Sequence, residues 1–292
     1  MSGANGVHMR RAFVGSMAAG MLAALIMLLI AYSHPSLLAR EKYVSDYAAA
    51  STIRQLFDNT AAQLANQTGV AYSFAAAESG YANATFNLGF AFQDASGLVS
   101  NYSLFLQDNY SSPASALITP DFSAMDNGRV EIMSNTTVFY ADYATQSAGF
   151  TAAPGVEATG MRNLSITFVT SQTLNQTTPW SYDEDGDINV TVSVQHAGGT
   201  NISNGLLDSS LAHYYWFNFT GTPGAKTFMV FAGNDSVSSG VAWVNVTSAP
   251  GSLTLSGVFP YWSGQLWYYN ATLAVDKGAI NRTSKVITWE GG

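Results

Sequence analysis

Fourteen of the eighteen asparagines between Tyr43 and Gly292 begin an Asn-x-Ser/Thr triplet, the acceptor motif for N-linked glycans. Ser and Thr fill 53 of these 250 positions, so chance would produce about four such triplets. The number and even spread of the triplets predict a domain exposed to a glycosylation machinery. The alternative is an Asn/Thr-rich β surface that forms them by accident. The acceptors are Asn66, Asn83, Asn101, Asn109, Asn135, Asn163, Asn175, Asn189, Asn201, Asn218, Asn234, Asn245, Asn270 and Asn281.

An acidic loop, Asp-Glu-Asp-Gly-Asp, is the sharpest local motif for metal binding. Carboxylates at its first, third and fifth positions suit Ca²⁺, a cation that takes six to eight oxygen ligands. The expected ligands are Asp183, Asp185 and Asp187. The match to an EF-hand loop then ends, because Ile188 stands at position 6 and Val194 at position 12. A structural Ca²⁺ site and a solvated acidic turn beside a strand both stay open.

Aromatic residues gather in three short stretches, 214–217, 259–262 and 267–269. Exposed Trp and Tyr side chains would form a face for binding sugars or surfaces. Strand cores favour the same residues, so packing in the interior is the main expectation. Trp216 and Trp243 stand out, because alternation along a strand places them on the faces that bear Asn218 and Asn245.

The sequence carries no recognisable catalytic motif. Its four histidines are not spaced as metal ligands, and there is neither a Gly-x-Ser-x-Gly elbow nor a phosphate-binding loop. The absence of cysteine excludes disulfides, thiolate catalysis and Cys-zinc sites. We therefore expect no enzyme. The alternative is an anchored hydrolase, which would need two carboxylates that meet only in the fold.

A run of 21 residues without a charge, Ala12–Tyr32, is predicted to be a transmembrane helix. Two basic residues flank it on each side, so the triplets determine the orientation: residues 1–11 form a cytoplasmic stub and the rest is extracellular. A cleaved signal peptide is the alternative, although its apolar core is typically shorter. Small residues recur every four positions and suit close helix packing. They are Gly15, Ser16, Ala19, Gly20, Ala23 and Ala24.

Residues 33–68 are predicted to continue as a helical extension or stalk. An apolar stripe at helical spacing supports this reading. It consists of Ile53, Leu56, Phe57, Ala61 and Leu64. Such a helix is a stalk, an assembly surface, or an element packed against the domain that follows.

From residue 69 to 292 the apolar period changes to two, which predicts a mainly antiparallel β ectodomain, sandwich-like, with two lobes that meet near residue 180. In the stretch Ile188–Val194, for example, valines alternate with Asn189, Thr191 and Ser193, so the glycan acceptor faces solvent. The expected strands are Thr85–Phe92, Tyr102–Leu106, Val130–Met133, Thr137–Tyr143, Leu164–Thr170, Ile188–Val194, Tyr214–Thr220, Thr227–Phe231, Val241–Val246, Leu253–Phe259, Gln265–Val275 and Lys285–Trp289.

Charge is distributed unevenly. Residues 1–42 carry a net charge of +3 and residues 43–292 carry −11, which together give the −8 of the chain. An acidic exterior argues against nucleic acid as a partner, since nucleic acid requires clustered Lys and Arg. A eukaryotic ectodomain of this size would usually contain disulfides. Many acceptor triplets without cysteine therefore fit an archaeal surface.

The order of these parts resembles archaeal type IV pilin-like proteins, a family that includes adhesive pilins and archaellins. The stretch Ala12–Asn66 carries the resemblance. It implies that the helix packs into a filament core while the β domain forms the glycosylated outer surface. The sequence departs from the family pattern at the processing site: no Lys-Gly or Arg-Gly pair precedes the apolar run, and no acidic residue occurs before Glu41. The large β domain favours a minor or tip-like subunit.

These observations together predict a single-pass cell-membrane protein with an extracellular, glycosylated C-terminal domain. Its role is structural or in assembly, as a minor pilin-like subunit. Its expected partners are the membrane and, through the N-terminal helix, other copies or pilin-like subunits. The alternative is a tethered Ca²⁺-dependent adhesin or carbohydrate-binding β-sandwich.

Overall fold

The computed structural model describes residues 4–78, 80–90, 95–111, 116–125, 128–220, 226–247, 249–261, 264–277 and 280–290. Within these ranges, the side chains of residues 4–20, 24, 28–41, 90, 96 and 226 are outside the description. The chain divides into two units, Met1–Thr52 and Ile53–Gly292. Each unit is described by itself.

A single helix, α1, runs from Ala4 to Thr68 and covers the whole extension read as helical from the sequence. The predicted transmembrane stretch Ala12–Tyr32 lies within it, but only the side chains at 21–23 and 25–27 belong to the described set. Among the residues that the structure describes, no helical segment has both the length and the hydropathy that a membrane span requires.

The second unit is mainly antiparallel β, as predicted. Two short helical elements, α2 (Ser96–Leu104) and the π-helix η1 (Phe105–Tyr110), interrupt the strands. The strands are β1 Ala71–Ala76, β2 Tyr81–Phe90, β3 Leu117–Asp121, β4 Arg129–Met133, β5 Thr137–Asp142, β6 Ser147–Ala152, β7 Asn163–Val169, β8 Thr173–Thr178, β9 Ile188–His196, β10 Gly199–Leu207, β11 Ala212–Thr220, β12 Lys226–Gly233, β13 Val241–Thr247, β14 Gly251–Pro260, β15 Leu266–Lys277 and β16 Ile280–Glu290.

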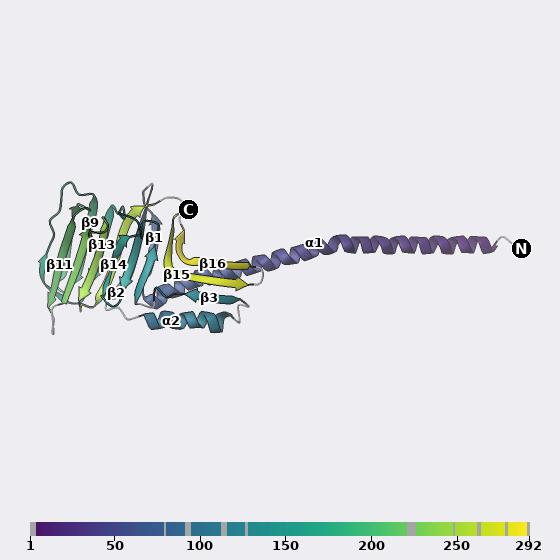
Figure 1. Ribbon diagram of the computed structural model, residues 1–292, viewed down its shortest axis with the longest axis horizontal. Helices are drawn as coiled ribbons and strands as arrows, with labels where there is room; N and C mark the ends of the chain where they lie inside the picture. The colour runs from purple at the N-terminus through teal and green to yellow at the C-terminus, as the bar shows by residue number, and fades with distance from the viewer. Residues whose placement is uncertain are drawn as a thin grey trace. The chain divides into compact units, whose positions relative to one another are not determined.

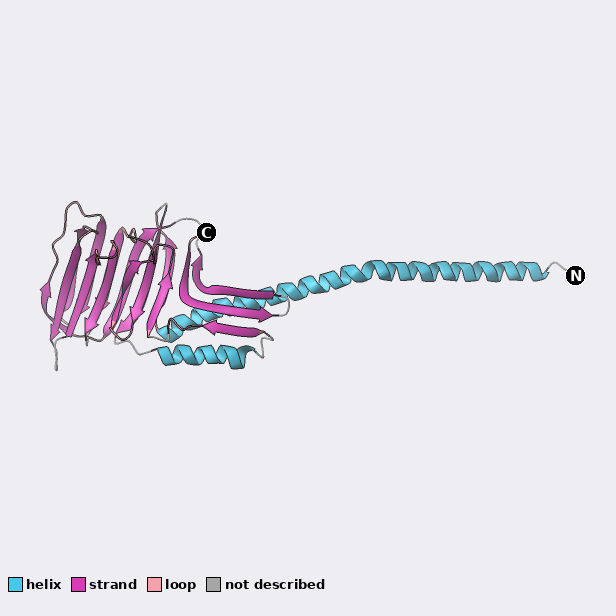
Figure 2. Ribbon diagram, in the orientation of Figure 1, coloured by secondary structure: helices cyan, strands magenta, loops and turns pink. Residues whose placement is uncertain are grey.

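The strands form two sheets that pack face to face (Figures 1 and 2). The six-stranded sheet has the order β1-β2-β14-β7-β9-β10. The ten-stranded sheet has the order β16-β15-β4-β5-β6-β13-β12-β11-β8, with β3 paired to β15. Neighbouring strands are antiparallel except for β7 and β9, which run parallel because β8, between them in sequence, belongs to the other sheet.

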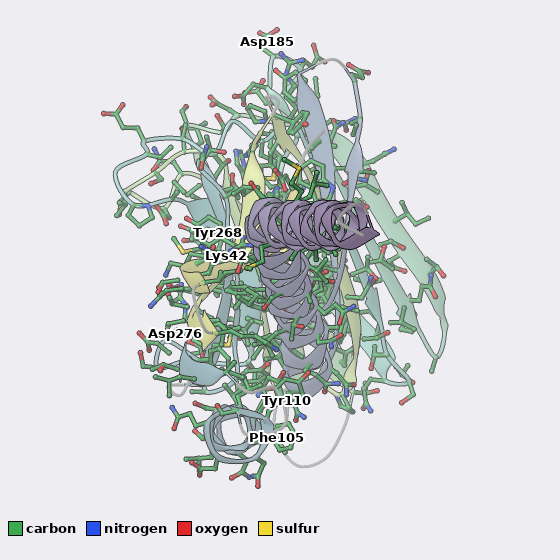
Figure 3. All side chains as sticks on the ribbon, turned by 90° about the vertical axis from the view of Figure 1, so that its right-hand side faces the viewer. Lys42, Phe105, Tyr110, Asp185, Tyr268 and Asp276 are labelled. Atoms are coloured by element: carbon green, nitrogen blue, oxygen red, sulfur yellow. The ribbon has the colours of Figure 1, made fainter. Side chains whose placement is uncertain are left out.

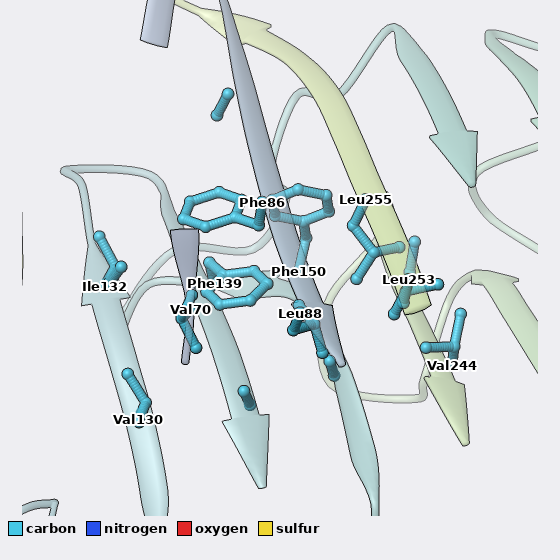
Figure 4. Close-up of a cluster of buried hydrophobic side chains, with 14 of the residues drawn as sticks. Val70, Phe86, Leu88, Val130, Ile132, Phe139, Phe150, Val244, Leu253 and Leu255 are labelled. Carbon is cyan, nitrogen blue, oxygen red and sulfur yellow. The ribbon is translucent and has the colours of Figure 1, made fainter. Parts of the chain in front are cut away.

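Aromatic side chains fill the space between the two sheets (Figure 4). Phe86 of β2 stacks on Phe139 of β5, with ring centres 3.8 Å apart, and Phe150 of β6 meets both rings edge-on. Further along, Phe168 of β7 stacks on Phe228 of β12 at 4.5 Å. Both stacked pairs join one strand of each sheet, so these contacts hold the layers together.

The last part of α1 belongs to this core. Leu64 is fully buried, and Ile53, Leu56, Phe57 and Ala61 of the predicted stripe are buried beside it. The Tyr143 hydroxyl donates a hydrogen bond of 2.7 Å to the carbonyl oxygen of Thr68, and the guanidinium of Arg282 lies 5.0 Å from the Phe57 ring centre. The stripe is therefore a docking face for the β domain rather than a free assembly surface.

Three expectations from the sequence need correction. The stretch Tyr102–Leu106 is helical, because Val99 and Leu106 lie on one helical face and are both buried. The strands β1, β3, β6, β8 and β10 were not predicted; β1, β8 and β10 lie at sheet edges, where burial imposes little pattern. A division into lobes near residue 180 is not seen, because β13 and β14 return to pair with strands that precede that point.

We expect Leu64→Ala to lower the free energy of unfolding by about 2–5 kcal/mol, because it leaves a cavity where α1 meets the β core. The matched control is Leu117→Ala in β3, whose side chain is 67% exposed, and it should change stability by less than about 0.5 kcal/mol. Urea unfolding of the full-length protein in detergent, followed by tryptophan fluorescence, measures both. Equal effects would show that the end of α1 does not contribute to the core.

Candidate functional site

None of the fourteen acceptor asparagines is buried, as the alternation of the strands predicted. Eight are exposed: Asn66, Asn101, Asn109, Asn135, Asn163, Asn175, Asn189 and Asn281. Six are half-buried: Asn83, Asn201, Asn218, Asn234, Asn245 and Asn270. Every acceptor residue thus lies at or near the surface.

The outer face of the six-stranded sheet places three acceptors in one row across the strands. Val258 of β14 pairs with Asn83 of β2 on one side and with Asn163 of β7 on the other. Asn163 pairs in turn with Asn189 of β9. The next row on this face holds only hydroxyl residues between β1 and β9, namely Ser73, Thr85, Ser256, Ser165 and Thr191. Three of these hydroxyls complete the triplets of the first row, so this face forms a regular polar acceptor surface.

Accidental triplets on a Ser/Thr-rich sheet would be confined to strands, but several acceptors lie elsewhere. Asn66 is in α1, Asn101 and Asn109 are in α2 and η1, and Asn135 is in the turn between β4 and β5. Others lie on the edge strands β8, β10 and β16, where a glycan would block pairing with another chain. The acceptors at these edges are Asn175, Asn201 and Asn281.

The acidic loop does not bring its carboxylates together. Asp187 turns towards Ser209, whose backbone N–H and hydroxyl donate hydrogen bonds of 2.7 and 2.6 Å to its two carboxylate oxygens. Asp183 instead accepts a bond from the backbone N–H of Asp185, and Asp185 lies at the outer end of the loop (Figure 3). Among the described residues, no group of three or more acidic or histidine side chains is placed to hold a metal ion. The predicted Ca²⁺ site at Asp183, Asp185 and Asp187 therefore gains no support.

Most of the aromatic stretches pack in the interior, as expected. Phe217, Phe259, Trp267 and Tyr269 are buried. The exceptions lie on the outer face of the ten-stranded sheet, where Tyr214 is 48% exposed and Trp216 is 38% exposed, while Trp243 is half-buried. Alternation alone placed Trp216 and Trp243 on this outer face, and the structure agrees.

These outer-face aromatics form a row across five strands. Tyr214 of β11 pairs with Phe231 of β12, and Phe231 pairs with Trp243 of β13. Trp243 is followed by Gly149 of β6 and then by Tyr140 of β5. A side chain at Gly149 would collide with the Ala242 carbonyl and the Cβ of Trp243, so only glycine allows the strands to approach this closely.

A pocket of about 340 Å³ lies at the Trp243–Tyr140 end of this row. Carboxylates, hydroxyls and a guanidinium surround the two rings, because β4, β5 and β6 and the loop before β13 all contribute polar residues. The lining residues are Arg129, Tyr140, Asp142, Thr145, Ser147, Thr151, Asp235, Val241 and Trp243. Sequence reasoning marked Trp243 but missed the others, since strands far apart in the chain bring them together.

Charged groups around Tyr140 determine the electrostatics of the pocket. The Arg129 guanidinium lies 4.4 Å from the Tyr140 ring centre, and its Nε is 2.9 Å from a carboxylate oxygen of Glu131. Burial raises the pKa of Tyr140 to about 12; Arg129 opposes this rise, and the carboxylates of Asp142 and Asp235 add to it. The phenol is therefore neutral at physiological pH and serves as a hydrogen-bonding group.

A second depression, of about 750 Å³, lies beside the acidic loop. Trp180, Tyr182, His213 and Tyr214 line it together with Asp183–Asp185. The His213 ring nitrogen Nε2 is 3.1 Å from the carbonyl oxygen of Asp208, and the ring lies edge-on to Trp180. These contacts hold His213 in the structure of the loop, which argues against a catalytic role.

The N-terminal part of α1 carries large apolar side chains in contact with solvent. Tyr43 and Tyr47 are 75% and 79% exposed, and Val44 between them is 65% exposed. In the predicted transmembrane stretch, Met21, Leu22, Leu25, Ile26 and Met27 are exposed. Of the predicted helix-packing residues, Ala23 is exposed, while the side chains of Gly15, Ser16, Ala19, Gly20 and Ala24 lie outside the described residues.

No protein-family model, no curated protein and no solved structure matches this chain.

The contacts of the acceptors predict a ranking of glycan occupancy. The amide nitrogen of Asn245 donates to the Thr145 carbonyl at 2.7 Å, and that of Asn270 donates to Glu131 at 2.9 Å. A glycan on either nitrogen would disrupt this bond, so we expect lower occupancy there than at the exposed Asn135 and Asn175. Glycopeptide mass spectrometry of the native protein measures all four sites.

The same experiment has an internal control. Glu131→Ala removes the acceptor of the Asn270 amide, so it should raise occupancy at Asn270 and leave Asn135 unchanged. Full occupancy at Asn245 and Asn270 in the wild type would contradict the ranking, and would indicate that glycans are added before these strands pair.

The raised pKa of Tyr140 predicts a pH dependence of stability. Between about pH 10 and 12 the unfolded tyrosine loses its proton while the folded one keeps it, so the free energy of unfolding falls as pH rises. Tyr140→Phe lacks this loss and should gain roughly 1–2 kcal/mol relative to wild type across that range. Denaturant unfolding at several pH values measures it, with Tyr43→Phe, which removes an exposed phenol, as the control. Parallel curves for wild type and Tyr140→Phe would contradict the assignment.

Proposed function

We propose that this protein is a membrane-anchored extracellular glycoprotein with a structural or assembly role, and that it acts as a minor pilin-like subunit. The apolar stretch Ala12–Tyr32 would be the anchor. The exposed part of α1 that follows it would contact other subunits, and the β domain would carry the glycans. The anchor itself is proposed from the sequence, where 21 residues pass without a charge.

One observation supports the assembly role: the apolar side chains of α1 are buried near its C-terminal end and exposed further towards its N-terminus. Leu64 and the four other residues of its stripe are buried against the β domain, whereas Tyr43, Val44 and Tyr47 are exposed. Large apolar side chains that cluster on one helix and face solvent mark interaction surfaces. Because the spacing of Tyr43, Val44 and Tyr47 is i, i+1 and i+4, they lie on one side of the helix and suit a second helix as the partner.

The placement of the acceptors supports an extracellular location. All fourteen are exposed or half-buried, and those in the helical elements and in the turn between β4 and β5 are not explained by a Ser/Thr-rich sheet alone. Glycans on the outer face of the six-stranded sheet and on the edge strands β8, β10 and β16 would keep the β domain from associating through its strands. Association would then be left to α1, which carries one acceptor, Asn66, near its C-terminal end.

Cross-linking tests this proposal directly, because the chain contains no cysteine. Tyr47→Cys places a single thiol on the exposed side of α1, and Leu117→Cys places one at an exposed site on the β domain. In native membranes under mild oxidation we expect a disulfide-linked dimer for Tyr47→Cys and little or none for Leu117→Cys. Non-reducing electrophoresis reads the result.

Two outcomes would overturn the proposal. If neither Tyr47→Cys nor Val44→Cys cross-links while the protein is abundant in the membrane, the helix does not associate. If the protein instead fractionates without membranes or filaments, and its mature N-terminus lies beyond Tyr32, then it has no anchor. Intact-mass and N-terminal analysis of the native protein distinguishes these cases and also counts the glycans.

A further inference from the structure

The pocket beside Trp243 has the features of a ligand site that an assembly role for α1 does not require. We propose that it binds a neutral saccharide. The indole of Trp243 would contact the apolar face of a sugar ring, and the carboxylates of Asp142 and Asp235 would accept hydrogen bonds from its hydroxyl groups. This proposal does not depend on the anchor or on association of the helices.

The Trp243 side chain is held in place by the ring of Phe231. The Trp243 indole stacks on the ring of Phe231, with centres 5.2 Å apart and planes within 17° of parallel. Phe231 is itself 2% exposed and meets Tyr214 edge-on, so its position is fixed by packing. A half-exposed indole with one face supported in this way is a rigid platform, which lowers the entropy lost on binding a ring.

The carboxylates are also positioned in advance. One oxygen of Asp142 accepts a hydrogen bond of 2.9 Å from the backbone N–H of Thr145. One oxygen of Asp235 accepts bonds from the backbone N–H groups of Val237 and Ser238, at 3.0 and 2.9 Å. Ser236, between Asp235 and Val237, adopts a φ of 77°, a region that residues other than glycine rarely occupy. Among the described residues, no donor reaches the second oxygen of either carboxylate. Because an ionised carboxylate only accepts, the ligand must donate.

Two donor chemistries fit these carboxylates, an ammonium group and a hydroxyl group. Arg129 already occupies the face of Tyr140 that a ligand cation would use, which favours the hydroxyl group. Asp142 and Asp235 oppose an anion in the same space. A neutral molecule with hydroxyl donors and an apolar ring face remains, which is the chemistry of a sugar. The volume of about 340 Å³ lies at the small end of ligand pockets and suits a short oligosaccharide.

The two outer faces of the sandwich differ in a way that fits this assignment. The face of the six-stranded sheet is a surface of Ser, Thr and Asn with three acceptors in a row. The face of the ten-stranded sheet carries the aromatic row and the pocket. Asn245 borders the pocket, since its amide nitrogen bonds to the Thr145 carbonyl, and a glycan there would compete for the site. The binding experiment therefore requires protein without glycans.

The test uses full-length protein produced in a host that adds no N-glycans and kept in a detergent without a sugar headgroup. Cellotetraose, mannotetraose and chitotetraose are titrated by isothermal calorimetry. We expect saturable binding of at least one of them with one site per chain. Trp243→Ala should weaken that binding by about tenfold or more, and Asp142→Asn, which keeps the side-chain shape, by about threefold or more.

Trp216→Ala is the matched control. Trp216 lies on the same outer face and is 38% exposed, but it does not line the pocket, so its removal should leave the affinity within about twofold. Asp142→Asn keeps the test decisive if circular dichroism shows that Trp243→Ala is misfolded.

Three results would overturn the proposal. The first is no saturable binding of any of the three tetrasaccharides. The second is an equal loss of affinity in Trp216→Ala and Trp243→Ala, which would indicate non-specific contact with exposed tryptophan. The third is binding of a trilysine peptide that Asp142→Asn abolishes, together with no binding of sugars, which would make the pocket a cation site.

Discussion

The packing of the two sheets through paired aromatic rings is the constraint on which the rest of the structure depends. Phe86 stacks on Phe139 and Phe168 on Phe228, so the layers are joined at two places and the inward faces of β2, β5, β7 and β12 are fixed. Because side chains alternate along a strand, the inward face of a strand determines which residues point outward. The outward residues include the acceptors on the strands and the pocket residues on β4 to β6 and β13. A slip of one residue in the register of β13 would bury Asn245 and expose Val244.

The sequence predicted those parts of the fold in which burial repeats along the chain. The strands around Leu164, Val190 and Val244 were found because apolar and polar residues alternate there, and the helix end was found from the stripe that includes Leu64. The polar edge strands β8 and β10 were missed, since pairing rather than burial decides their conformation. The stretch Tyr102–Leu106 was misread because aromatic residues favour strands locally, while its packing partners are known only in the fold.

The candidate site shows that local motifs can be predicted from the sequence, whereas sites built from distant strands cannot. Each acceptor motif consists of three consecutive residues, so all of them can be read from the sequence. The pocket is built from β4, β5, β6 and the loop before β13, and this loop follows the three strands by about a hundred positions in the chain. Trp243 was recognised because it shares a strand face with Asn245. Asp142, Asp235 and Arg129 gave no signal, because a single carboxylate or guanidinium is common on any surface. Conversely, the acidic loop matches a local metal-binding motif, yet the carboxylate of Asp187 accepts a hydrogen bond from Ser209.

The two outer faces of the sandwich differ in their side chains, although both carry acceptors: Asn218 and Asn245 lie on the face of the ten-stranded sheet that bears the aromatic row. The proposed glycans on the outer face of the six-stranded sheet would need small polar side chains around them, and the rows through Asn83 and Ser165 consist of little else. The proposed saccharide site would need rigid rings and oriented polar groups, which Phe231 and the backbone around Asp235 provide. Since the same core supports both faces, a substitution that loosens it should disturb the geometry of the pocket before it affects the acceptors. A pocket requires several side chains to be in register, while an acceptor requires only access to solvent.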